Sequence, residues 1–328
     1  MAIHIGRQEF VVTLGSATVV WPLAARAQQA MPVVAILDSA VMSPDAALAF
    51  RSGLTEAGYT EGRNVAIELR STEQYDRLPA LAAELVERRV AVIFAIGGPS
   101  APAAKAATTT IPIVFSIGGD PVELGLVTAL NRPGGNITGA TFFTAPLLQK
   151  QVSILHELVP KAAVFGFLVN PNNPRARADI DNVQAAAQIL GLSIHVVEAG
   201  SESKFDTAFA SFIEHNALGA IITGDPLFFR AGSKLGGLAA RHGLPAVFGS
   251  SQRSFAEAGG LAVYGASVYD AHHQAGIYAG RILKGEKPGD LPVVQPSKFT
   301  FILNMKSAQA LGLQVPLYLQ QLADEVIE

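Results

Sequence analysis

The feature that most constrains the fold is an alternation that runs from Met31 onward. Short apolar runs rich in β-branched residues alternate with longer, alanine-rich segments of helical periodicity. Such alternation is typical of parallel sheets, because each helix carries the chain back to the start of the next strand. It occurs twice in 328 residues, enough for two domains of ordinary size. We therefore predict an α/β fold of two doubly wound parallel-sheet lobes.

The first repeat of this pattern predicts five strands with helices between them. The strands are expected at 32–37, 64–69, 90–96, 111–116 and 136–140, and the helices near 44–58, 76–89, 100–109 and 121–131. Each strand is short and apolar and is followed by a segment with helical spacing of its apolar residues. Together they predict one complete doubly wound unit.

The second repeat begins with a helix near 146–159. Its strands are expected at 163–169, 192–198, 219–223, 245–248 and 261–264. A helix near 268–284, a stretch rich in proline and glycine, and an apolar run at 299–304 follow. We expect these last elements to cross back between the lobes and to form a hinge of several strands. The N-terminal lobe then comprises 31–143 and about 266–294, and the C-terminal lobe 144–265 and about 295–328.

The N-terminus predicts export from the cytoplasm. A weakly basic start precedes an apolar stretch at 10–23 and then Ala25-Arg26-Ala27, the order of a cleavable signal peptide. The apolar stretch is about a dozen residues long, whereas a membrane span needs about 20. We predict that residues 1–27 are a signal peptide cleaved after Ala27, by the Sec or the Tat route. The mature chain is then periplasmic, with no stable membrane insertion, and without cysteine it is not a lipoprotein.

Charge and motifs argue against several classes of protein. The formal net charge of −3 supplies no broad basic field, so nucleic acid is not an expected partner. The sequence contains no G-x-S-x-G, Walker A, G-x-G-x-x-G or H-E-x-x-H motif. His272 and His273 are neighbours on an expected helix and point about 100° apart, so we expect a solvated helix face there and no shared metal. We predict a protein without catalytic residues, metal or cofactor.

Polar residues follow the expected strands and mark the side where a ligand would bind. Gly119-Asp120-Pro121 and Gly224-Asp225-Pro226 both read as strand-to-helix corners, because Asp suits the N-cap and Pro the first helical turn. In open α/β sheets, ligands bind outside the carboxyl ends of the strands. Each residue also has an alternative structural role as a cap, turn or packing residue. The candidate ligand-binding residues are Ser39, Gly98, Ser100, Asp120, Asn170, Asn172, Asp225, Ser250 and Tyr264.

Several segments also resemble a known family. These are W-P-L-A-A-R-A-Q at 21–28, G-L-T-E-A-G-Y-T-E-G at 53–62, I-P-I-V-F at 111–115 with G-D-P at 119–121, L-N-R-P-G-G-N at 130–136, V-N-P-N-N at 169–173 and G-R-I-L-K-G at 280–285. Over essentially its whole length the chain resembles the ABC-transporter substrate-binding proteins of the group that includes aromatic amino-acid binders. The resemblance implies a type I periplasmic-binding fold and closure about a hinge. It also implies delivery of the ligand to a permease driven by an ATPase, both on separate chains.

Carried over residue by residue, the resemblance favours the following cleft residues: Ser39, Ser100, Asp120, Asn170, Asp225 and Ser250. Relatives that bind amino acids often have an acidic residue near the position of Ser250, where this chain has Gly249-Ser250-Ser251. The only tryptophan is Trp21, inside the expected signal peptide, so the mature chain has no tryptophan on which a sugar would stack. Amino acids, small aromatic acids and other polar metabolites all remain open as ligands.

We therefore expect a monomeric periplasmic solute-binding component of an ABC importer, which closes around a small polar or aromatic metabolite such as an amino acid. One alternative is an enzyme on the same doubly wound fold, with Asp120 or Asp225 as acid or base. The other is a ligand-sensing regulator. That class needs a basic helix-turn-helix, which the apolar first thirty residues do not resemble.

Overall fold

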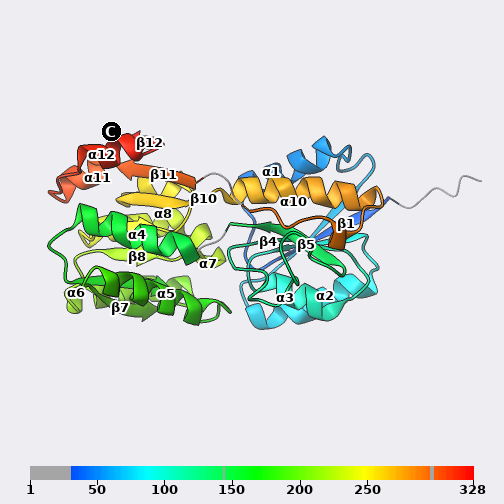
Figure 1. Ribbon diagram of the computed structural model, residues 1–328, viewed down its shortest axis with the longest axis horizontal. Coiled ribbons are helices and arrows are strands. Elements are labelled where there is room, and N and C mark those ends of the chain that lie inside the picture. The colour runs from blue at the N-terminus through cyan, green and yellow to red at the C-terminus, as the bar shows by residue number, and fades with distance from the viewer. Residues whose placement is uncertain (1–30, 143–144, 296–298) are drawn as a thin grey trace, which may run out of the picture. The chain divides into compact units, whose positions relative to one another are not determined.

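The computed structural model describes residues 31–142, 145–295 and 299–328. The expected signal peptide and its cleavage site lie outside the described residues. Two sheets organise the chain, as the sequence predicts (Figure 1). We call the five-stranded sheet and its packed helices the first lobe, and the seven-stranded sheet and its packed helices the second lobe.

The first lobe contains a parallel sheet of order β2-β1-β3-β4-β5. The strands are β1 (Val33–Asp38), β2 (Ala66–Ser71), β3 (Val92–Ile96), β4 (Ile113–Ile117) and β5 (Ile137–Thr141). The helices are α1 (Pro44–Glu56), α2 (Leu78–Glu87), α3 (Ser100–Ala107) and α10 (Val268–Leu283). Helices α1 and α10 cover one face of the sheet, and α2 and α3 cover the other (Figure 1).

The period of two along each strand explains these two helix layers. Val34, Ile36 and Phe94 pack with α1 and α10, whereas Leu37 and Ala95 pack with α2 and α3. All five side chains are almost fully buried. Because both faces are covered, the central strands β1, β3 and β4 are nearly continuous hydrophobic runs, which is typical of a parallel sheet covered on both sides.

Helix α10 is held on the first lobe by close backbone contact with α1. A Cβ on Gly53 would lie 1.9 Å from the His273 carbonyl oxygen, and one on Gly276 would lie 2.1 Å from the Phe50 carbonyl oxygen. Only glycine allows this approach, because any larger residue would push the helices apart. The contact fixes which side of α10 faces the sheet.

The second lobe contains a sheet of order β12-β11-β10-β9-β8-β6-β7. Its strands are β6 (Val164–Val169), β7 (Ser193–Glu198), β8 (Ala220–Ile222), β9 (Ala246–Phe248), β10 (Ala262–Ala266), β11 (Phe299–Asn304) and β12 (Glu325–Ile327). All pairs are parallel except β10 with β11, which is antiparallel. The apolar run expected at 299–304 is therefore a strand of this sheet.

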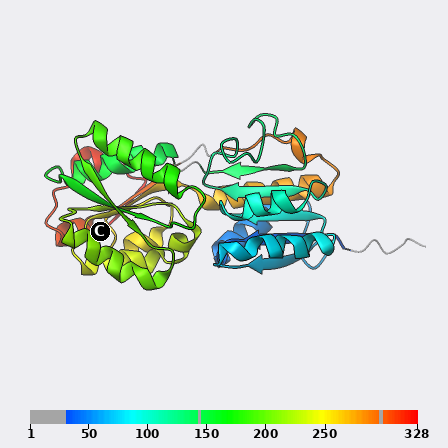
Figure 2. The same cartoon turned by 90° about the horizontal axis from the view of Figure 1, so that it is seen from below.

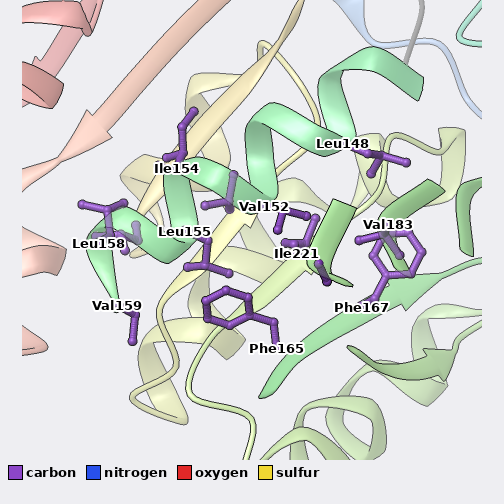
Figure 3. Close-up of a cluster of buried hydrophobic side chains, with 14 of the residues drawn as sticks. Leu148, Val152, Ile154, Leu155, Leu158, Val159, Phe165, Phe167, Val183 and Ile221 are labelled. Atoms are coloured by element: carbon purple, nitrogen blue, oxygen red, sulfur yellow. The ribbon is translucent and has the colours of Figure 1, made fainter. Parts of the chain in front are cut away.

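Helices cover both faces of the second sheet (Figure 2). They are α4 (Ala145–Leu158), α5 (Ala176–Ile189), α6 (Phe205–Glu214), α7 (Pro226–Arg230), α8 (Gly232–Arg241), α9 (Arg253–Glu257), α11 (Met305–Ala310) and α12 (Leu317–Leu322). Figure 3 shows the core beneath α4, where Val152 and Leu155 lie above Phe165 and Ile221 of the sheet. No helix in the described part of the chain is long and apolar enough to cross a bilayer.

One predicted helix is absent. Residues 121–131 form turns, and the prediction of a helix there is wrong. The segment begins one helical turn, in which Leu124 N donates to the Asp120 carbonyl oxygen at 3.0 Å. Gly125 then has φ +65°, which ends the turn, because a left-handed residue breaks the helical hydrogen-bond series. Asp120 therefore caps a turn and no helix.

Candidate functional site

The order of strands predicts a crevice at one point of each sheet. In the first sheet β2 lies on one side of β1 and β3 lies on the other. In the second sheet β7 and β8 likewise lie on opposite sides of β6. At such a switch point the loops after the two strands diverge and leave a crevice, where ligands bind. The described chain has a cavity at each of these points.

The larger cavity, which we call the main cavity, has a volume of about 710 Å³. It is lined by the loop after β1, by the ends of β3 and β4, and by α7, the loop after β9 and α10. Both lobes thus contribute to its wall. This volume suits a ligand of amino-acid or monosaccharide size with its ordered water.

Asp38, the last residue of β1, brings a carboxylate into the main cavity. It is 2 % exposed, and within the described chain the only hydrogen bond to its carboxylate comes from Ala40 N at 3.0 Å. Burial raises the pKa of the Asp38 carboxyl to about 7, although the Ala40 amide acts in the opposite direction. A buried carboxylate with so little compensation is suited to meeting a cationic group of a ligand.

His272 on α10 is buried, whereas the sequence predicted a solvated position. The prediction of a solvated helix face is wrong for this residue, which is 3 % exposed and lines the main cavity. The close α1–α10 contact turns it toward the sheet, where its ring packs edge-on against Phe94 at 5.7 Å between centroids. His273, one position on, lies 3.3 Å from the Glu56 carboxylate. The two histidines do point apart, as the helical geometry predicts.

Further polar groups of the main cavity have no partner in the described part of the chain. They are the hydroxyls of Ser116 and Ser251, both buried. Buried polar atoms of a folded protein are rarely left without hydrogen bonds, since each costs about 1–3 kcal/mol. Such atoms around one cavity indicate groups held ready for a ligand or for water that a ligand displaces.

Aromatic and charged residues complete the wall. Phe142 and Phe229 approach to 6.2 Å between ring centroids and give the cavity an apolar side. Arg230 pairs with Glu73 at 2.7 Å and with Glu202 at 2.9 Å. Arg253 likewise pairs with two carboxylates, those of Glu257 and Glu325. The guanidinium groups are thus already neutralised, whereas Asp38 has no cationic partner among the described residues.

The second cavity, of about 440 Å³, lies at the other switch point. Ser39, Tyr75, Asn170 and Arg230 are among its lining residues. Ser39 is buried, and its hydroxyl donates to the Ile96 carbonyl oxygen at 3.1 Å. Of the nine candidates from the sequence, Ser39 and Asn170 thus line a cavity.

Asp225 is the centre of a hydrogen-bond network. Its Oδ1 accepts from Leu227 N at 2.8 Å, which caps α7, and from Asn170 Nδ2 at 3.1 Å. Its Oδ2 accepts from Asn173 Nδ2 at 2.6 Å. Tyr75 of the first lobe donates to Oδ1 at 3.4 Å and so links the two lobes. The side chain is 0 % exposed, and burial raises the pKa of its carboxyl against these hydrogen bonds.

The remaining candidates line neither of the two cavities. Gly98 and Ser100 are buried at the start of α3, where the Ser100 hydroxyl has no partner in the described chain. Asn172 is exposed, and its backbone N–H donates to Asn170 Oδ1 at 3.1 Å. All three lie in turns or at a helix start.

The last three candidates also make structural contacts. Asp120 Oδ1 accepts from Val122 N at 2.7 Å, as expected of a turn residue. Ser250 is buried, and its Oγ accepts from Gln252 N at 3.0 Å. Tyr264 stacks on Phe299 at 6.4 Å between centroids, within β10 and β11. Its aromatic face is used in packing.

The candidates chosen from the sequence left out the polar residues that line the main cavity. Asp38 had a detectable signal, since it ends an apolar strand directly before Ser39. Ser116 is the last but one residue of β4, within an apolar run. His272 had no local signal, because its orientation depends on the packing of α10 against α1. No group of three or more potential metal ligands occurs among the residues described.

Two doubly wound lobes, with a cavity at their strand ends and walls from both, are the arrangement of bilobal solute-binding proteins. Residues 33–327 match the family described as ABC transporter substrate binding protein. The chain belongs to this family, and it is the solute-binding component of an ABC transporter. Members of the family are non-enzymatic binders, and they are typically extracytoplasmic.

Individual relatives agree with this assignment. A curated relative, the tyrosine-binding protein of Clostridioides difficile, is 28% identical over 268 residues, covering 81% of this chain and 76% of the relative. A solved structure from Streptococcus pneumonia in complex with L-Trp superposes with a TM-score of 0.79 at 24% identity, covering 90% of this chain and 99% of that one. A conserved domain protein from Vibrio cholerae superposes with a TM-score of 0.82, also at 24% identity and with the same coverage. These structures confirm the α/β periplasmic-binding-protein-like fold.

Proposed function

We propose that this protein binds a small amino acid or amino-acid-like aromatic metabolite in the main cavity and presents it to a permease and an ATPase on separate chains. The observation that carries the proposal is the Asp38 carboxylate, which is 2 % exposed and lines a cavity of about 710 Å³ without a cationic partner among the described residues. The names of the relatives, one tyrosine-binding and one in complex with L-Trp, support the same ligand class.

Each part of an aromatic amino acid has a complementary group in the cavity wall. The ammonium group meets Asp38, whose charge it neutralises. The hydroxyls of Ser116 and Ser251 donate to the ligand carboxylate, and Phe142 and Phe229 pack against the apolar side chain. Asp38 in the first lobe thus takes the role of the acidic residue that relatives have near the position of Ser250. Ser39 and Asn170, which line the second cavity, contact the ligand or its ordered water in the closed state.

Closure about a hinge is part of the proposal. We take residues 31–143 with about 266–294 as one moving lobe, and 144–265 with about 295–328 as the other. The ion pair of Arg230 with Glu73 and the Tyr75 contact to Asp225 join the lobes and favour a closed state. Closing removes water from the apolar part of the ligand, and binding energy for the closed form drives the motion.

The proposed setting is the periplasm. A signal peptide cleaved after Ala27 leaves a monomeric mature chain that begins at Gln28, and a chain without cysteine has no site for lipid attachment. Neither the enzyme nor the regulator alternative has a supporting observation in the described structure. Family membership favours the binder over both.

A melting-temperature screen tests the ligand class. L-tyrosine, L-tryptophan and L-phenylalanine are compared with 3-(4-hydroxyphenyl)propionate, which is tyrosine without its amine, and with glucose. We expect one or more of the amino acids to raise the melting temperature. We also expect 3-(4-hydroxyphenyl)propionate to bind about tenfold more weakly than L-tyrosine. In Asp38→Asn this preference for the amine should disappear. Equal binding of both forms would contradict the role of Asp38, and stabilisation by glucose alone would contradict the ligand class.

A further inference from the structure

His272 is a buried side chain with a defined protonation state. Its Nδ1 lies 2.5 Å from the Val268 carbonyl oxygen. A carbonyl oxygen only accepts hydrogen bonds, so the ring proton must be on Nδ1. Burial lowers the pKa of the imidazole to about 4, and the ring therefore carries one proton at neutral pH. Nε2 is then a bare acceptor.

This acceptor has no partner in the described chain. Nε2 is buried, and the residue is 3 % exposed and lines the main cavity. The ring cannot turn away easily, because it packs edge-on against Phe94 and sits on a helix locked to α1 by Gly53 and Gly276. An unpaired acceptor on a residue that lines a ligand cavity can act as a specificity device, since a ligand that lacks the matching donor leaves it unpaired.

We propose that His272 selects ligands that present an N–H or O–H donor to its Nε2, in addition to the ammonium group that meets Asp38. This inference rests on the proposed function and narrows its ligand class. A phenol or an indole N–H supplies such a donor on the aromatic end of an amino acid, and a phenyl ring does not.

The other titratable groups of the cavity do not supply this donor themselves. Asp38, Asp45, Arg230, Arg253, Glu257 and Tyr269 also line it. None of them makes a hydrogen bond to His272 within the described chain. No donor among the described residues reaches Nε2, so the proposed donor is the ligand or water that the ligand replaces.

Pairs of ligands that differ only in this donor test the proposal by calorimetry. L-tyrosine is compared with L-phenylalanine, and L-tryptophan with 1-methyl-L-tryptophan. We expect the wild-type protein to bind the donor-bearing member of a pair about tenfold or more tightly. His272→Leu should reduce this ratio to about one, and His273→Leu, the matched control on the same helix, should retain it. Equal binding of both members by the wild type, or an unchanged ratio in His272→Leu, would overturn the proposal.

The melting temperature without ligand tests independently whether Nε2 is unpaired. If Nε2 is unpaired, His272→Leu should melt at or above the wild-type temperature, because the change removes a buried polar atom and keeps an apolar volume. A melting temperature several degrees lower would mean that Nε2 has a structural partner and would overturn the proposal. If none of the four amino acids binds, the ligand class of the proposed function fails. The ligand-free comparison still decides the state of His272.

Discussion

Substitution of Asp225 separates a structural role from direct contact with the ligand. In Asp225→Ala the N-cap bond to Leu227 N is lost, which costs about 1 kcal/mol. The Asn173 amide also loses its acceptor at 2.6 Å, and a buried donor left unpaired costs about 1–3 kcal/mol. Asn173 cannot turn its amide round, because its Oδ1 already accepts from Arg175 N. We expect the free energy of unfolding to fall by about 3 kcal/mol.

Asp225→Ser is the matched control, because serine is as good an N-cap as aspartate. Its free energy of unfolding should be about 2 kcal/mol below that of the wild type, so the difference between the two variants isolates the contribution of the cap. The assays are denaturant unfolding and calorimetry with the amino acid that most stabilises the protein. Since the carboxylate is 0 % exposed and fully engaged, Asp225→Ser should bind that ligand within about threefold of the wild type. A tenfold loss of affinity with unchanged stability would refute this reasoning and favour the ligand contact expected from the sequence.

The remaining predictions concern pH, closure and export. For Asp38, whose pKa is raised from 3.8 to about 7, stability falls as pH rises through this window, by up to about 4 kcal/mol. For His272, whose pKa is lowered from 6.5 to about 4, stability instead falls as pH drops through that window. Melts of Asp38→Asn and His272→Leu from pH 4 to 8 should each lose one of these slopes, and two unchanged profiles would contradict both assignments. Small-angle scattering should show a smaller radius of gyration with bound ligand, and an unchanged profile at saturation would count against closure. Mass spectrometry of periplasmic protein should find Gln28 at the N-terminus, whereas an intact Met1 start would disprove cleavage.

The fold was predictable from the sequence because its signals are local. Apolar runs and helical periodicity are read within about ten residues, and the strands of both sheets lie within a few residues of their expected places, except β12, which was not predicted. The helix expected at 121–131 failed because one glycine, Gly125, adopts positive φ. Helical spacing alone does not reveal such a residue.

The site was less predictable because pairing depends on tertiary contacts. Ser39 and Asp38 are neighbours at the end of β1, yet Ser39 is satisfied by the Ile96 carbonyl oxygen and Asp38 is left facing the main cavity. The burial of His272 arises from the contact of Gly53 with α10, across more than 200 residues of sequence. The strand-end corners indicated at which edge of each sheet a ligand would bind, but not which polar groups remain unpaired there.

Blocking the main cavity tests most directly whether it is the ligand site. Val41 lines the cavity and is 56 % exposed, so Val41→Trp adds bulk there without disturbing a packed core. Val122, 42 % exposed and outside both cavities, provides the matched control Val122→Trp. In calorimetry with the most stabilising amino acid, we predict at least about tenfold weaker binding for Val41→Trp and wild-type affinity for Val122→Trp. Wild-type affinity in both variants would contradict the assignment of the ligand to this cavity.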